Sequence, residues 1–408
     1  MNTFPTPDRQ LPLPLKLAPE DFVVEEVLRA EPSRTGDFAL YRATKRLMTT
    51  PDLQQQIASQ LGLPPRAVVF PALKDRQAVT TQHFTIRGRA PLSLEGQGFS
   101  AYFIGRMARH LHPSDLLGNR FTVRLPSLPP AVAEAVAQRF SELEHAGLPN
   151  YFDEQRFGSR TRKGTFIGKA ILQGDAETAL RAYLAEPAPG DPPALRSFKA
   201  FAAQHWRDWP TLFQHAPRSN HRSVLTFLKD HPRDFRKAVN LISPRLLPLM
   251  LAAYQSLLWN LVASGVLERR LEAAGLRTAR IEIAGEPLVA YRRLPEALVE
   301  ELRRLQIPLL HHRATFSDPL VEGVAGEVLA REGLALAQLK ARLLRRAYLP
   351  RGDRPLLLFP QQTKAQLEES NESGKRDLRL SFFLPPGSYG TLVVKVLAAT
   401  TPLPLGQR

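Results

Sequence analysis

The spacing of apolar residues changes several times within the first 90 residues. Residues 22–24 begin a strand-like run, whereas apolar side chains between 50 and 61 recur every fourth residue, as on one helical face. Residues 68–70 and 83–86 are each predicted to be a strand. Residues 71–82 are therefore expected to form a loop between two strands, where the scaffold fixes a side chain that remains accessible.

Strand and helix patterns continue to alternate up to about residue 150. Strand-like runs cover 99–107 and 120–125, and apolar residues between 132 and 143 share one face of a helix that ends at Gly147. This mixed order predicts an α+β fold.

The chain becomes mainly helical after residue 158 and returns to strands later. Residues 232–261 are predicted to be largely helical, with Ser243-Pro244 as a start signal. From Leu378 onward, the runs LRLSFFL and TLVVKVL are predicted to be two strands, separated by a turn at 385–387. This order suggests one discontinuous domain that carries a mostly helical insertion.

Length and charge narrow the function. The chain has 408 residues, enough for two domains with their own hydrophobic cores. It carries 55 Lys and Arg residues against 39 Asp and Glu, a formal net charge of +16. Although basic surfaces also serve solubility, this excess favours nucleic acid as a partner.

Several classes of protein are excluded by composition. Cysteine is absent, which excludes disulfides, thiolate nucleophiles, zinc–thiolate sites and iron–sulfur clusters. The first residues lack the pattern of a secretory signal, and no stretch approaches the about 20 apolar residues of a membrane span. We therefore expect a cytoplasmic protein without a membrane partner.

The strongest candidate for chemistry is Asp75, which lies between two fixed cations, Lys74 and Arg76. Neighbouring positive charge is expected to lower the pKa of the carboxyl group and keep it ionised, which suits a nucleophile or electrostatic stabiliser. For an arbitrary Lys-Asp-Arg triplet, an exposed turn with local ion pairs is the commoner explanation. The residues around this triplet favour the catalytic interpretation.

Six segments carry a family resemblance. They are PEDFVVEE (19–26), KDRQAVTTQH (74–83), GNRFT (118–122), NYFDEQRFG (150–158), AYQSLLWN (253–260) and FLPPGSYGT (383–391). In this order they resemble the TruD family of tRNA pseudouridine synthases over nearly the whole chain. Three positions depart from the family pattern: Ala72 and Asp153 replace a usual Gly, and Gly390 stands where Ala is common.

The resemblance implies a pseudouridine synthase catalytic domain over 1–158 and 340–408, built on a mixed, mainly antiparallel sheet with flanking helices. A mostly helical α/β insertion, the TRUD domain, would occupy 159–339. The partner would be tRNA, and the reaction would isomerise uridine 13 of the D arm to pseudouridine with Asp75 as the catalytic aspartate. This chemistry needs no cofactor and no metal, and we expect a monomer.

The resemblance also assigns contacts with the isomerised uridine. Phe22, Phe121 and Tyr389 would offer flat apolar faces to a flipped base, whose extrusion costs a few kcal/mol. For each aromatic residue taken alone, core packing is the ordinary explanation. Asn119 would hydrogen-bond the base or sugar, and the Tyr389 phenol could take part in proton transfer at C5.

Four polar residues complete the expected site. Lys74 and Arg76 are expected to steady Asp75 or to bind phosphate, with surface ion pairing as the alternative. Gln155 and Arg156 are expected to hold the RNA backbone.

Two other functions fit the sequence less well. The first is an RNA-binding protein without catalysis that acts as a tRNA folding chaperone. The second is another carboxylate enzyme such as a glycosidase, which would need a paired acid at suitable spacing. Glu20, Asp21, Glu25 and Glu26 are candidates for that acid only in composition.

Overall fold

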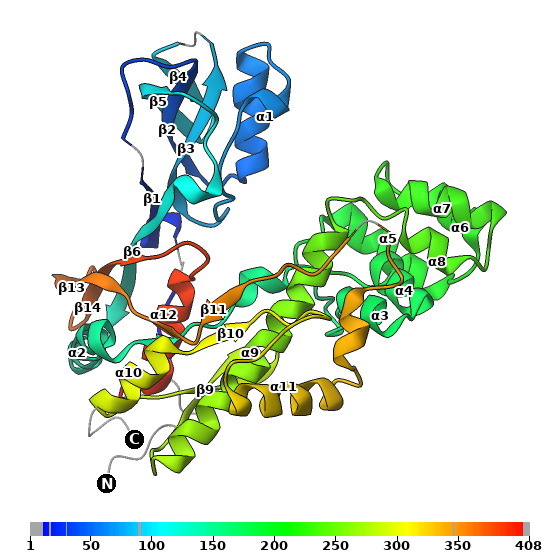
Figure 1. Cartoon of the computed structure of the whole chain (residues 1–408). Coiled ribbons are helices and arrows are strands. Elements are labelled where there is room, and N and C mark those ends of the chain that lie inside the picture. Colours follow the sequence, from blue (N-terminus) through cyan, green and yellow to red (C-terminus); the bar gives the residue numbers. More distant parts are fainter. Residues whose placement is uncertain (1–10, 16–17, 30, 89–90, 346, 403–408) are drawn as a thin grey trace. The chain divides into compact units, whose positions relative to one another are not determined.

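The computed structural model describes residues 11–15, 18–29, 31–88, 91–345 and 347–402 (Figure 1). The chain divides into two compact units, Met1–Leu148 with Leu358–Arg408 (unit 1) and Pro149–Leu357 (unit 2). The first boundary expected from the sequence, at 158/159, lies after the one at 148/149, and the second, at 339/340, lies before the one at 357/358.

Unit 1 is built on one eight-stranded sheet in the order β13-β14-β6-β1-β3-β2-β5-β4. Only β1 and β3 run parallel, and every other neighbouring pair is antiparallel. The mixed, mainly antiparallel sheet predicted for an α+β fold is thus confirmed. The elements are β1 (Phe22–Leu28), β2 (Phe38–Arg46), α1 (Thr50–Gln60), β3 (Val79–Arg87), β4 (Ser93–Gly96), β5 (Phe99–Met107), β6 (Leu116–Leu128), α2 (Pro130–Ala146), β13 (Gln361–Glu369), β14 (Arg376–Leu384) and α12 (Gly390–Thr400).

Three helices flank this sheet (Figure 1). Leu53 and Ile57 of α1 are fully buried against Tyr41 of β2 and Phe84 of β3, whose rings stack at 4.9 Å. At the other end of the sheet, α2 lies against β13 and β14, and α12 lies against α2. The buried faces of these helices follow the apolar spacing of the sequence.

Unit 2 is mostly helical, with one short β-hairpin and a second pair of short strands that lie far apart in the sequence. Its longest helix, α9, is buried along most of its length and forms the centre of the unit. The elements are α3 (Ile167–Gln173), α4 (Ala176–Ala185), α5 (Pro193–Gln204), α6 (Trp209–His215), α7 (Asn220–Asp230), α8 (Phe235–Val239), α9 (Leu247–Ala273), β8 (Ala279–Ile283), β9 (Glu286–Ala290), α10 (Glu296–Arg304), β10 (Gln306–Pro308), α11 (Pro319–Arg331) and β11 (Asp353–Pro355), with the two-residue strands β7 (Leu148–Pro149) and β12 (Leu357–Leu358) at the boundaries between the units.

Two predicted strands are wrong. Residues 68–70 form only one bridge, between Val69 and Thr85, because the N–H of Val68 already bonds Pro65 in a 3₁₀ turn. The run TLVVKVL is not a strand but lies within α12. A short apolar run fits a buried strand and a buried helix equally well, so periodicity could not decide between them.

The start and the composition of α9 also differ from expectation. The helix begins at Leu247 with Pro248 in its first turn, so Ser243-Pro244 is not its start. Its 27 residues are long and apolar enough to cross a membrane, which corrects the expectation that no stretch approaches a span. However, 89% of its most apolar stretch is buried inside the protein, so the helix packs as a core element of unit 2.

Candidate active site around Asp75

Asp75 lies in the loop between the Val69 bridge and β3, as the loop prediction required. Its side chain is half-buried, whereas Leu73 and Arg76 on the same loop are exposed. The loop therefore combines a half-buried carboxylate with side chains that reach solvent.

Lys45 of β2 holds the backbone of Asp75. Its ammonium group is buried and donates hydrogen bonds to the carbonyls of Asp75 and Met48, both at 2.6 Å. Burial lowers the pKa of Lys45 to about 8, although the negative charge of Asp75 acts to raise it. Sequence reasoning missed this residue, which lies 30 positions before Asp75 and outside the six family segments.

Lys74 holds the loop from the other side. Its ammonium group lies 2.9 Å from a carboxylate oxygen of Glu26 and donates to the Asn119 side-chain oxygen at 2.6 Å. Its backbone N–H donates to the Thr50 hydroxyl at 3.0 Å. Since the Lys74 side chain is only 7% exposed, it anchors the loop to β1, β6 and α1 and has little surface for a phosphate.

Glu26 is the buried counter-charge of the site. Pairing between β1 and β3 stops after Glu25 and Thr81, and the Glu26 carboxylate then accepts the His83 N–H at 2.8 Å. The His83 ring nitrogen Nδ1 lies 3.2 Å from the same oxygen. Burial alone would raise the pKa of Glu26, but the His83 hydrogen bonds and the Lys74 charge outweigh it and hold the pKa below its ordinary value.

The sequence did not single out Glu26, because each face of β1 carries apolar residues and one acid. Phe22, Val24 and Glu26 alternate along β1 and all three are buried, so the acid occupies a core-facing position of the strand. A carboxylate there requires partners, because an unpaired buried charge is strongly unfavourable. Composition alone, as used for the glycosidase alternative, did not show this.

The predicted aromatic contacts differ in exposure. Phe22 and Phe121 are buried and meet edge to face at 5.9 Å, and Phe121 stacks on Phe382 at 5.3 Å. Tyr389 is partly exposed and directly precedes α12. The next residue, Gly390, approaches the Phe121 ring so closely that an added Cβ would lie 2.5 Å from it. Phe121 thus links Phe22 to the turn that carries Tyr389.

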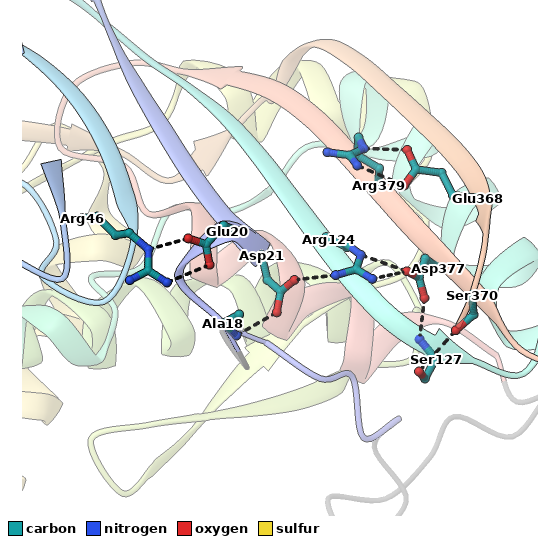
Figure 2. Close-up of polar contacts among 10 residues, drawn as sticks. All are labelled: Ala18, Glu20, Asp21, Arg46, Arg124, Ser127, Glu368, Ser370, Asp377 and Arg379. Atoms are coloured by element: carbon teal, nitrogen blue, oxygen red, sulfur yellow. Dashed lines mark hydrogen bonds and ion pairs between the residues drawn. The ribbon is translucent and has the colours of Figure 1, made fainter. Parts of the chain in front are cut away.

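Ion pairs fix the start of β1. Arg124 of β6 pairs with Asp21 at 3.2 Å and with Asp377 of β14, and Arg46 pairs with Glu20 at 2.5 Å (Figure 2). Glu20 and Asp21, two of the glycosidase candidates, are therefore engaged in holding three strands together.

Gln155 and Arg156 belong to unit 2, where the segment 150–158 is tied to α9. The Asn260 carboxamide accepts from the Phe152 N–H and donates to its carbonyl, both at 2.8 Å. The Arg156 Nε donates to the Ser256 hydroxyl at 2.9 Å, and Gln155 is exposed. Two of the six family segments therefore bind each other, which gives them a structural role besides any contact with RNA.

The departure at Asp153 lies inside the protein. The residue is 1% exposed, so its charge is not part of the surface around Gln155.

Within the described ranges of the chain, no three histidine, aspartate or glutamate side chains gather to hold a metal ion.

Comparisons with known proteins agree with the six segments. The chain matches the family described as tRNA pseudouridine synthase D (TruD) over residues 1–397. It is 30% identical to a protein of Methanocaldococcus jannaschii named as a probable tRNA pseudouridine synthase D 2, over 93% of this chain and 90% of that one. The tRNA pseudouridine synthase D of Aquifex aeolicus is 29% identical over 94% and 97% of the two chains.

A solved structure shares the fold. The crystal structure of a candidate tRNA pseudouridine synthase D (TruD) from Methanosarcina mazei superposes with a TM-score of 0.71 at 23% identity. The superposition covers 98% of this chain and 97% of that one.

Proposed function

Because the chain belongs to the tRNA pseudouridine synthase D (TruD) family, we propose that it isomerises uridine 13 in the D arm of tRNA, with Asp75 as the catalytic carboxylate. The observation that carries the role of Asp75 is the pair of buried ammonium groups beside it. Lys45 holds its carbonyl, and Lys74, one residue before it, is held by Glu26 and Asn119. A loop that is held at these two points positions the Asp75 side chain for a reacting atom.

The proposed reaction conserves all the atoms of the uridine. The bond between N1 and C1′ breaks, the base turns, a bond from C5 to C1′ forms, and the proton on C5 is lost while N1 gains one. Asp75 acts at the sugar or the ring during this exchange. We assign no single point of attack to it.

The proposed contacts follow the exposure of the side chains. Asn119 accepts from Lys74 through its oxygen, so its amide nitrogen is the group proposed to donate to a uracil carbonyl. Tyr389 is proposed to cover the face of the flipped base. The buried Phe22 and Phe121 are proposed to form the apolar floor of the same site. Arg76 is proposed to bind tRNA phosphate.

Gln155 and Arg156 of unit 2 are likewise proposed to contact tRNA. The support for this is the formal charge of +16 and the position of both side chains at the surface of their unit. No membrane and no small-molecule cofactor enter this proposal.

The test is tritium release from tRNA transcripts that carry 5-tritiated uridine. We expect release by the wild-type protein and none by Asp75→Asn, with the modified position mapped to uridine 13. Release by both proteins would remove Asp75 from the reaction, and a different mapped position would remove uridine 13. No release by either, with tRNA binding retained, would favour the folding-chaperone alternative.

A further inference from the structure

Unit 2 contains a pocket of about 420 Å³ that the isomerisation chemistry does not use. Gln155 and Arg156 line one side, and Leu246, Leu249 and Met250 at the start of α9 line another. Leu246 and Leu249 are 37% and 54% exposed although both are large and apolar. Isolated exposed leucines are ordinary, but two that line the same pocket form an apolar entrance.

The inner end of the pocket is polar. The His221 ring stacks on Tyr183 at 4.3 Å with an angle of 6°, and both residues are more than nine-tenths buried. One ring nitrogen of His221 lies 3.1 Å from the Ser219 hydroxyl, a contact that helps to hold the ring against Tyr183. The stacked Tyr183 and His221 rings therefore form a flat, fixed part of the pocket wall.

The charged side chains that line the pocket have a net positive charge. Lys199 and Asp191 form a buried ion pair at 2.9 Å, so the acid is neutralised within the pocket. Burial, with the nearby Lys199 charge, lowers the pKa of His221 to about 4, so its ring is neutral at pH 7. Arg156 is the other cation that lines the pocket, and one of its N–H groups is used by Ser256.

We propose that this pocket receives one unpaired nucleobase of the tRNA, separate from the uridine that is isomerised. The inference rests on the proposed function, because it takes tRNA as the substrate. A nucleobase has two flat apolar faces for the leucine and methionine side chains and a polar edge for the exposed carboxamide of Gln155. Arg156, which lines the same pocket, can pair with the phosphate group of that nucleotide.

The experiment measures kcat and KM for pseudouridine formation in an unmodified tRNA transcript. We expect the double variant Leu246→Ala/Leu249→Ala to raise KM about tenfold and to leave kcat unchanged, since stacking contacts contribute to binding. The matched control is Leu241→Ala, because Leu241 is 39% exposed in unit 2 and does not line the pocket. Its KM should stay within about twofold of wild type, as for surface substitutions away from such features.

Transcripts with one abasic nucleotide at a time identify the occupant. One abasic position should raise KM with the wild-type protein and cause no further rise with the double variant, because both changes remove the same contact. A wild-type KM in the double variant, or a raised KM that no abasic position reproduces, would overturn the nucleobase pocket. In both cases wild-type turnover of the intact transcript still reports the proposed function separately.

Discussion

Replacing Glu26 by Gln tests whether the buried carboxylate holds the Asp75 loop. The substitution keeps the shape and one acceptor oxygen but removes the counter-charge of Lys74, which is almost fully buried. Breaking a buried ion pair from one side costs about 3–5 kcal/mol. Because Gln retains an acceptor, we expect the lower end, about 3 kcal/mol, in the stability of unit 1.

Hydrogen exchange followed by mass spectrometry is the suitable assay, because a chain with two units need not unfold in one step. Peptides from β1 and β3 should exchange about a hundredfold faster in Glu26→Gln, since each 1.4 kcal/mol is a factor of ten. All three tryptophans, Trp206, Trp209 and Trp259, lie in unit 2. Tryptophan fluorescence in denaturant therefore follows unit 2 as an internal control.

The neighbouring Glu25→Gln is the matched control. Glu25 pairs with Arg42 at 2.9 Å, but the two side chains are 37% and 53% exposed, so the loss should be below about 1 kcal/mol. If Glu26→Gln exchanges no faster than Glu25→Gln, the ion pair does not hold the loop and the reasoning is refuted.

The pH dependence of the Glu26 effect has a definite sign. Its pKa is lowered in the folded protein, so the ionised carboxylate stabilises fully above the unfolded-state value near 4.5. That contribution is lost as the pH falls through the folded-state pKa. The difference between wild type and Glu26→Gln should therefore be constant near neutral pH and shrink below about 4.5.

Three further substitutions have defined outcomes. Lys45→Met should lower kcat about 100-fold through misplacement of Asp75, with little change in KM. The pKa of Lys45 is about 8 in the folded protein and 10.5 in its ordinary state. The stability of the wild type relative to this variant should therefore rise between pH 8 and 10. Gly390→Ala should destabilise unit 1 by about 1–3 kcal/mol in a denaturant titration, because its Cβ would overlap the Phe121 ring. Tyr389→Phe should shift the basic limb of the pH–rate profile if the phenol moves a proton at C5, and an unchanged profile would end that hypothesis.

Local patterns predicted much of unit 1. The apolar spacing of α1 and α2 and the strand-like runs at β1 and β5 were sufficient to locate these elements. They also placed Asp75 in a loop before β3. The error at α12 arose because the run TLVVKVL is short and mostly apolar, and such a run fits a buried strand and a buried helix alike.

The supports of Asp75 could not be predicted in the same way. Glu26 meets His83 across 57 positions and Lys45 meets Asp75 across 30, and nothing local in the sequence indicates such pairs. The residues of β1 leave open which of Glu25 and Glu26 faces the core, and they do not show which cation lies opposite. The partnership of Asn260 with Phe152 depends likewise on the fold of unit 2.

The order in which the strands of unit 1 emerge from the ribosome has a consequence for biosynthesis. Unit 2 is one continuous stretch, whereas β6 acquires its neighbour β14 only after unit 2 has been made. Until residues 376–384 are available, β6 presents an open row of backbone hydrogen-bonding groups, the template on which sheets associate between molecules. A polypeptide truncated within unit 2 should therefore aggregate through β6, even though the Asp75 loop and the strands that hold it have already been synthesised.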